Sequence, residues 1–228
     1  MRIGIIGAME SEVTYLRDQM ENPVTEKVGL ATFYAGKLYG KDTVLSQCGI
    51  GKIHAAMCAQ AMILRYAPDR IINIGVAGAL DDMLDIGDIV IGNFAVQHDI
   101  DTCAFGDPLG CVPGINIVEI PCDEELTRAM TEACAEENLM GMCAGIATGD
   151  QFIAALEKKN FLREHFQCAA CDMEGGAIAQ VCHEMNVPYG AYRAISDTLT
   201  GNEKEYSENV KEAALSSQKL LRAFYNHL

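Results

Sequence analysis

The chain has 228 residues, half of them hydrophobic, which is enough to bury a sizeable core within one domain spanning residues 1–228. Its 32 acidic and 17 basic residues give a formal net charge of −15, which excludes a basic surface for nucleic acid or anionic lipid. No apolar run is long enough to cross a bilayer, and the first residues turn acidic too soon for a secretory signal. We therefore expect a soluble, cytoplasmic protein that binds a small, uncharged or cationic molecule.

Strand-like and helix-like segments alternate along the chain without a repeat or a low-complexity linker. In chain order we expect a strand over 2–8, a helix over 10–20, a strand over 43–48, a helix over 53–67, strands over 70–80, 87–97 and 115–120, a helix over 124–137, a strand over 142–150, a helix over 154–166, a strand over 168–173, a helix over 175–186, a strand over 189–196 and a long C-terminal helix. This alternation predicts a single α/β domain with a central, largely parallel mixed sheet flanked by helices.

The ten cysteines are interpreted as reduced thiols, because disulfide frameworks belong to short secreted chains with small cores. A metal site is the alternative, since His165, Cys168 and Cys171 are spaced three apart. No second pair completes a tetrahedral set, and the two cysteines lie on a predicted strand that directs them to opposite faces. We therefore expect neither a metal nor a cofactor.

Glycine-rich segments follow several predicted strands, where ligands bind in α/β sheets. Residues 49–52, Gly-Ile-Gly-Lys, either cradle a phosphate or form a tight strand-to-helix turn. The turn is favoured, because the segment lacks both the Walker spacing and the dinucleotide fingerprint. Residues 75–80, GVAGAL, either let a ligand approach the backbone closely or only solve a packing problem.

Three carboxylates lie close behind predicted strands. Taken singly, Glu12 is a solvated helix residue, Glu174 a first-turn acid and Asp197 a cap. Together at one crevice, without local countercharges, they are expected to repel one another and to raise at least one pKa. Such a set suits hydrolysis through a cationic, oxocarbenium-like transition state.

The chain resembles the 5′-methylthioadenosine/S-adenosylhomocysteine nucleosidases of the nucleoside phosphorylase superfamily over nearly its whole length. The segments that carry the resemblance are IGIIGAMESEV, GIGK, NIGVAGAL, HDIDTCAFG, TGDQFI, DMEGGAIAQVCH and VPYGAYRAISD. The resemblance implies a nucleoside phosphorylase-like fold and a homodimer. It also implies hydrolysis of the N-glycosidic bond of 5′-methylthioadenosine, S-adenosylhomocysteine and 5′-deoxyadenosine, with release of adenine.

The resemblance further assigns roles by position. Glu12 resembles the base that activates water, and Asp197 the acid that protonates purine N7. Glu174 resembles the residue that binds the ribose hydroxyls, with Met173 against the sugar. Protonation helps adenine to leave, and nearby carboxylates favour a cationic sugar.

The rest of the pocket follows in the same way. Phe152 is expected to stack on adenine and the backbone of Ile153 to read its edge. Arg193 and Ser196 resemble the residues that brace Glu174 and Asp197. The remaining expected pocket residues are Val76, Ala77 and Gly78 at the base and ribose, Met9, Ile50 and Tyr206 at the alkylthio channel, and Phe105 and Pro113 reaching in from the partner subunit.

Two departures from the family pattern bear on the site. Val76 stands where many members have Ser near the catalytic Asp, so Ser196 or water is expected to orient Asp197 instead. The segment 198–210 also differs from the commoner pattern, which leaves the placement of Tyr206 and the preference for the substrate's 5′ tail, including a futalosine-type tail, open.

Two rival functions are weighed against the nucleosidase. A phosphorylase of the same superfamily needs a cationic phosphate site, and an acid at position 12 opposes an anionic nucleophile. A non-catalytic adenosine-binding module needs the pocket but not three aligned carboxylates. Release of adenine from methylthioadenosine separates enzyme from binding module.

Overall fold

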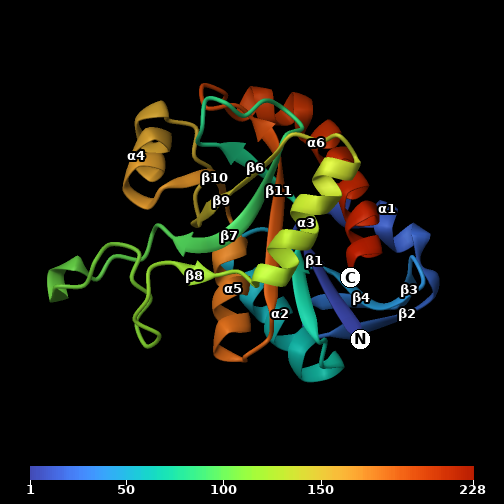
Figure 1. Ribbon diagram of the computed structural model, residues 1–228. Coiled ribbons are helices and arrows are strands. Elements are labelled where there is room, and N and C mark those ends of the chain that lie inside the picture. Colours follow the sequence, from blue (N-terminus) through green and yellow to red (C-terminus); the bar gives the residue numbers. More distant parts are fainter.

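An eleven-stranded mixed sheet runs through the molecule in the order β2-β3-β4-β1-β5-β11-β6-β10-β9-β7-β8 (Figure 1). The computed structural model describes all 228 residues. The strands are β1 (Arg2–Gly7), β2 (Glu21–Val28), β3 (Ala31–Leu38), β4 (Lys41–Gln47), β5 (Arg70–Asn73), β6 (Val76–Ala79), β7 (Ile89–Gln97), β8 (Ile120–Pro121), β9 (Gly141–Thr148), β10 (Cys168–Asp172) and β11 (Tyr189–Asp197).

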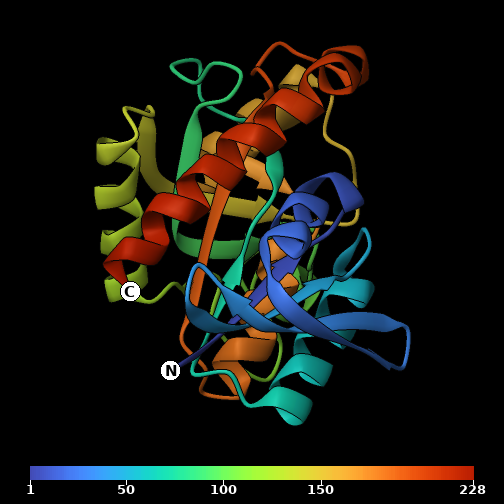
Figure 2. The same ribbon diagram turned by 90° about the vertical axis from the view of Figure 1, so that its right-hand side faces the viewer.

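Helices cover both faces of this sheet. The helices are α1 (Glu10–Gln19), α2 (Lys52–Tyr66), α3 (Glu124–Glu136), α4 (Leu156–Phe166), α5 (Gly175–Glu184) and α6 (Glu203–Phe224), with short 3-10 turns η1 (Cys103–Phe105) and η2 (Tyr225–His227). One core cluster of 27 buried residues includes the apolar faces of α2 and α5, and a second of 24 includes those of α1, α3 and α6. Figure 2 shows α6, the long red helix, lying across one face of the sheet. The predicted α/β class with a mixed sheet and flanking helices is confirmed.

The strand β11 is the centre of the arrangement. It pairs in parallel with β5 and β6 and antiparallel with β7. Because β6 pairs with β10, β10 with β9 and β9 with β7, these strands and β11 close into a ring. All nine residues of β11 are buried, so its last residue, Asp197, is carried into the interior.

Two expectations for single elements are wrong, and one pair of strands was missed. The predicted strand over 70–80 is two strands, since the chain breaks at Ile74 and Gly75, where Gly75 has a φ of +154°. Residues 115–119 are turn and bend apart from an isolated bridge between Ile117 and Val112, and only Ile120 belongs to a strand, β8. The antiparallel pair of β2 and β3 was not predicted, because β2 is polar, lies at the sheet edge and contains Pro23.

No helix in the structure combines the length and the apolar character that crossing a membrane requires.

Candidate active site

A cavity of about 230 Å³ opens where several strand ends meet. Glu12, Glu174 and Asp197 all line it, although they follow or end three different strands. The other predicted residues that line it are Met9, Ile50, Val76, Ala77, Gly78, Phe152, Ile153, Met173, Ser196 and Tyr206. The lining residues that were not expected in this pocket are Ala8, Gln151, Cys171 and Asp172.

Glu12 lies in the first turn of α1 and is only 3 % exposed, so it is not a solvated helix residue. Its Oε2 accepts hydrogen bonds from the backbone amides of Ala8 (2.7 Å) and Met9 (2.9 Å), and its Oε1 accepts one from Val76 (3.1 Å). Burial raises the pKa of the Glu12 carboxyl above its ordinary value, and these amides oppose the rise. A carboxylate held by backbone and shifted in this direction can act as a general base near neutral pH.

The break between β5 and β6 brings the backbone close to Glu12. A Cβ on Gly75 would lie 2.7 Å from Oε1 of Glu12. With its positive φ, position 75 needs glycine both for conformation and for space. The GVAGAL segment therefore does more than solve a packing problem, since its backbone directly contacts a cavity carboxylate.

Glu174 precedes α5 and is buried. Its Oε1 accepts a 2.8 Å hydrogen bond from the backbone amide of Gly51. Burial, together with the nearby Asp172 carboxylate, raises the pKa of Glu174 to about 7, while the Gly51 amide and Arg193 oppose the rise. A raised pKa among the cavity acids agrees with the sequence prediction, but burial is a larger cause than mutual repulsion for both Glu174 and Glu12.

Asp197 is the last residue of β11 and has a buried countercharge, which corrects the sequence expectation. Its Oδ2 accepts a 2.8 Å hydrogen bond from Nζ of Lys159, and its Oδ1 accepts one from Oγ of Ser196 at 3.1 Å. Ser196 thus orients Asp197 as expected, but Lys159 is the second donor. A sequence signal for Lys159 exists, because it shares a buried stripe of α4 with Leu162 and Phe166 at helical spacing.

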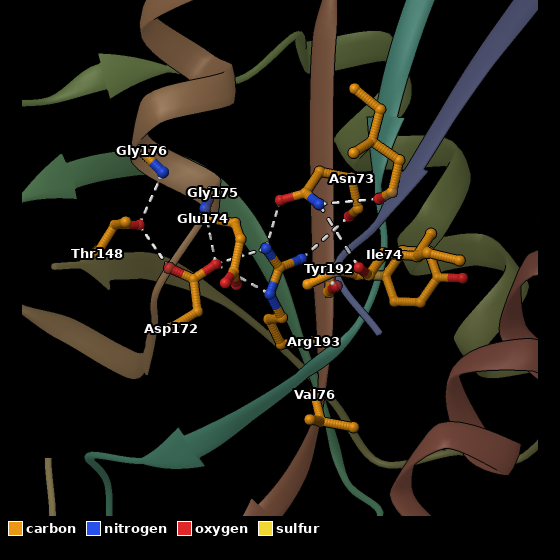
Figure 3. A network of polar contacts seen from close by, with 12 residues as sticks. Asn73, Ile74, Val76, Thr148, Asp172, Glu174, Gly175, Gly176, Tyr192 and Arg193 are labelled. Carbon is orange, nitrogen blue, oxygen red and sulfur yellow. Dashed lines mark hydrogen bonds and ion pairs between the residues drawn. The ribbon is translucent and has the colours of Figure 1, made fainter. Parts of the chain in front are cut away.

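Arg193 lies behind the cavity, and it holds Glu174, which it was expected to brace, only through Asp172 and not by a hydrogen bond of its own (Figure 3). Its Nε donates to Oδ2 of Asp172 at 3.0 Å, and its Nη1 donates to the carbonyls of Asn73 (3.1 Å) and Tyr192 (2.9 Å). The same Asp172 oxygen accepts the backbone amide of Gly175 at 2.9 Å. Arg193 therefore anchors the start of α5, and with it Glu174, through Asp172.

The mouth of the cavity is apolar and aromatic. The rings of Phe152 and Tyr206 meet edge to face with centroids 5.4 Å apart. The hydroxyl of Tyr206 donates to Sδ of Met9 at 3.3 Å. Phe152 and Ile50 are exposed, whereas Ile153 is buried. Tyr206, whose placement the sequence left open, therefore lines the cavity.

Phe105 and Pro113 do not line the cavity of their own chain. Both lie between β7 and β8, in a segment that extends away from the body of the molecule (Figure 1). Phe105 is 88 % exposed. Their contribution to a partner's pocket stays a prediction.

His165, Cys168 and Cys171 are not arranged as metal ligands, and no group of three or more His, Cys, Asp or Glu side chains in the structure is. The ring of His165 stacks on Phe161 and meets Phe166 edge to face. All ten cysteines are free thiols.

Comparison with known proteins shows the family to which this chain, with its α/β fold and its three carboxylates in one cavity, belongs. A model of the Phosphorylase superfamily matches residues 2–226, so the chain belongs to that superfamily. A 5′-methylthioadenosine/S-adenosylhomocysteine nucleosidase of Anoxybacillus flavithermus is 41 % identical over 232 aligned positions, covering 100 % of this chain and 99 % of the relative. Within the superfamily, the chain belongs to the 5′-methylthioadenosine/S-adenosylhomocysteine nucleosidases.

Solved structures agree in fold. The nucleosidase of Neisseria meningitidis in complex with methylthio-immucillin-A superposes with a TM-score of 0.94 and 36 % identity, covering 100 % of this chain and 99 % of that one. The futalosine hydrolase of Helicobacter pylori superposes equally well, with a TM-score of 0.94, 31 % identity and coverage of 100 % and 98 %. The same fold thus occurs in a methylthioadenosine/S-adenosylhomocysteine nucleosidase and in a futalosine hydrolase.

Proposed function

We propose that this chain hydrolyses the N-glycosidic bond of 5′-methylthioadenosine and S-adenosylhomocysteine, and also that of 5′-deoxyadenosine, releasing adenine and the 5′-substituted ribose. The observation that carries the proposal is the convergence of Glu12, Glu174 and Asp197 on one cavity of about 230 Å³. The relatives that share the family are named for the first two substrates. A non-catalytic adenosine-binding module would need the cavity but not three buried carboxylates.

Asp197 is the general acid in this mechanism. Adenine is a poor leaving group as an anion, so a proton delivered to N7 lets it depart as a neutral base. Asp197 is buried at the end of β11, and the backbone of Gly78 lies close beside its carboxyl group. General acid catalysis of this kind contributes about 10²- to 10⁴-fold to the rate.

Glu12 is the general base that takes a proton from the attacking water. Three backbone amides fix its two oxygens, so the carboxylate is held in one orientation before substrate binds. An anionic nucleophile such as phosphate would be repelled by this carboxylate. The geometry therefore favours hydrolysis over phosphorolysis.

Glu174 binds the ribose hydroxyls and supplies negative charge beside the sugar. Because the sugar becomes cationic as the bond breaks, the interaction is stronger in the transition state than in the ground state. Met173 packs on the sugar, Phe152 stacks on adenine and the backbone of Ile153 contacts the adenine edge. Val76, Ala77 and Gly78 form the floor of the base and ribose pocket.

The 5′ tail lies at the mouth formed by Met9, Ile50 and Tyr206. In the proposed homodimer, Phe105 and Pro113 of one subunit close the mouth of the other, which accounts for the exposure of Phe105 on a projecting segment. The proposed location is the cytoplasm, because ten free thiols suit a reducing compartment. Because the chain is similar to a futalosine hydrolase, a nucleoside with a futalosine-type 5′ tail is the alternative substrate whose turnover should be compared.

The variant Asp197→Asn tests the mechanism. An amide can still hydrogen-bond to a purine nitrogen but cannot deliver a proton, so kcat should fall by about 10²-fold or more while binding of adenine changes little. Adenine release and calorimetric titration with adenine measure the two quantities. Near-native turnover in this variant would remove Asp197 from the mechanism.

A further inference from the structure

Lys159 is a buried lysine that the proposed mechanism does not use. It lies in the middle of α4, its side chain is fully shielded from solvent, and it does not line the cavity. Lysine is among the residues least often buried, since taking its charge out of water is unfavourable. A lysine in this place therefore needs partners that compensate for the lost hydration.

The partners are three oxygen atoms around one ammonium group. Nζ of Lys159 donates to Oδ2 of Asp197 at 2.8 Å, to the carbonyl of Thr198 at 2.8 Å and to the carbonyl of Gly201 at 3.3 Å. An ammonium group has three protons to donate, so all three are used. Lys159 thus joins the carboxyl group of Asp197 to the loop that follows it.

These contacts fix the orientation of Asp197 from behind the cavity. Lys159 donates to Oδ2, while the Ser196 hydroxyl lies 3.1 Å from Oδ1 and 3.1 Å from the carbonyl of Ala77 and shares one proton between them. Lys159 is therefore the stronger of the two donors to the carboxyl group. Val76, at the cavity wall, has no side-chain donor to offer. The carboxyl plane is therefore set by one neutral hydroxyl and one full positive charge.

The same ammonium holds the loop between β11 and α6. This loop leads from Asp197 to Asn202, which caps α6, and then to Tyr206 at the cavity mouth. The carboxylate of Glu205 closes the loop from the other side by accepting the backbone amide of Thr198 at 2.6 Å. The acid and the mouth of the cavity are consequently fixed by one connected set of hydrogen bonds.

We propose that Lys159 is a positioning residue for the catalytic acid and that its ammonium stabilises the carboxylate that Asp197 becomes when it gives its proton to the purine. The inference rests on the proposed role of Asp197. In the transfer, the O–H bond of Asp197 breaks and the N7–H bond forms, while the electron pair stays on the carboxyl oxygen. The electron pair of the glycosidic bond then moves to the purine, which leaves as neutral adenine. Lys159 keeps its three protons throughout.

The attraction between the Lys159 ammonium and Asp197 becomes stronger once Asp197 has given up its proton. A cation 2.8 Å from a carboxyl group attracts the ionised form more strongly than the neutral form. Stabilisation that grows as the proton leaves lowers the barrier rather than merely strengthening binding. Loss of the ammonium should therefore lower kcat more than it changes KM.

The groups that face Asp197 define what a pH profile can report. They are Lys159 from α4, Cys171 from β10, Ser196 from β11 and Tyr206 from α6. Burial raises the pKa of the Cys171 thiol to about 12 and also raises the pKa of Tyr206. Both stay neutral between pH 5 and 9. Glu12 and Glu174 line the same cavity and have raised pKa values, so they titrate in the profile as well. The difference between a variant that removes the charge at position 159 and one that keeps it therefore reports on Asp197.

The experiment compares Lys159→Met, which keeps length and removes charge, with Lys219→Met, an exposed lysine of α6 that serves as the control for net charge. Adenine release from methylthioadenosine gives kcat, KM and their pH dependence, and circular dichroism checks the fold. We expect Lys159→Met to lower kcat by about 10-fold or more, which is the usual effect of losing a hydrogen bond to a charged group. KM should stay within about twofold of the wild-type value. The alkaline limb of its profile should move to higher pH, since no cation then favours the ionised acid.

Two further variants keep the inference testable if Lys159→Met folds poorly. Where circular dichroism shows the same folded fraction at each pH, the shape of a pH profile does not depend on the amount of folded enzyme. Lys159→Arg, which keeps the charge, should retain the wild-type alkaline limb. In the double variant Lys159→Met/Asp197→Asn, the loss from Lys159→Met should vanish, because the two residues act as one unit.

The outcomes separate this inference from the mechanism. If Asp197→Asn is inactive but Lys159→Met keeps wild-type kcat and pH profile, Lys159 is only structural and the inference is overturned. A lowered melting temperature with unchanged kcat and profile has the same meaning. If Asp197→Asn itself keeps its turnover, the proposed mechanism fails first.

Discussion

The backbone amide of Gly51 donates a 2.8 Å hydrogen bond to Oε1 of Glu174, a residue 123 positions later in the chain. Gly51 precedes α2 and has a φ of +97°, a conformation that favours glycine. The interpretation of Gly-Ile-Gly-Lys as a tight strand-to-helix turn is confirmed, since the segment joins β4 to α2. The turn also directs its amide to a carboxylate of the protein itself, in the way that helix N-termini bind anions.

The raised pKa of Glu174 predicts that its ionisation weakens the folded state. Its folded pKa of about 7 lies above the ordinary value of 4.5, so between these values the unfolded chain loses the proton while the folded chain keeps it. Stability must therefore fall as pH rises through this window and level off above about 7. The loss between pH 5.5 and pH 8 should be about 2 kcal/mol for this one group.

Urea unfolding of the protein without nucleoside, at one fixed protein concentration, measures this loss. Glu174→Gln is the matched control, because an amide oxygen can still accept from Gly51 but cannot ionise. The wild type should lose more stability than Glu174→Gln between the two pH values. Equal losses in both proteins would show that Glu174 ionises normally.

Gly78 is expected to be required for the orientation of Asp197. A Cβ at position 78 would lie 2.8 Å from Oδ2 and 3.3 Å from Oδ1 of Asp197. Because Ser196 and Lys159 hold that carboxyl group, it cannot move aside without losing a hydrogen bond. Gly78→Ala should lower kcat by about 10-fold or more, as expected when a charge-assisted hydrogen bond is lost.

Steady-state adenine release checks the effect of Gly78→Ala in two backgrounds. In the wild-type background, Gly78→Ala should lower kcat by about 10-fold or more. In the Asp197→Asn background it should lower kcat only slightly, because the acid that it displaces is already absent. An equal loss in both backgrounds would mean that the added methyl group acts on substrate binding instead.

Subunit complementation tests the contribution of Phe105 to the partner's cavity. Phe105→Ala should weaken the cavity of the neighbour, and Glu12→Gln should inactivate its own. In a mixed dimer, the Phe105→Ala chain keeps an intact Glu12 and receives Phe105 from the other chain. Co-refolding the two variants should therefore restore activity above the sum of the separate proteins. No gain on mixing, with mixed dimers demonstrated, would mean that Phe105 does not act across subunits.

Strong local patterns predicted most of the fold and the three cavity acids, whereas the family resemblance supplied the other expected cavity residues. Apolar runs mark β1, β7 and β11, and the acids that follow or end such runs meet at one cavity. What the sequence did not predict depends on tertiary context. The edge strand β2 is mostly exposed and so lacks the alternation of a half-buried strand.

Lys159 illustrates the same limit within the site. In sequence it stands in a helix with four other charged residues, and only its spacing with Leu162 and Phe166 marks it as buried. Its partner Asp197 is 38 positions away, and their pairing depends on how α4 packs beside the ring of strands. The direct bond of Arg193 to Asp172 rather than Glu174 could not be predicted for the same reason, since both acids lie in one short segment.

The final prediction concerns Glu12 and distinguishes hydrolysis from phosphorolysis. Water needs a base to become a good nucleophile, whereas phosphate brings its own negative charge. Adenine release should therefore proceed in phosphate-free buffer and give the free thioribose rather than its 1-phosphate. Glu12→Gln should lower the rate by about 10²-fold or more, as expected for loss of a general base.

The variant Glu12→Gln also disturbs one contact, which the measurement must separate from the chemistry. Its amide oxygen can still accept from Ala8 and Met9, but its amide nitrogen would face the Val76 amide, where Glu12 has an acceptor at 3.1 Å. A calorimetric titration with adenine shows whether the cavity is intact, since adenine binding does not require the base. If adenine binds normally and the hydrolytic rate is nonetheless retained, Glu12 is not the base. If phosphate is required for adenine release, the chain is a phosphorylase, and the carboxylate at position 12 must then be protonated or displaced to admit an anion.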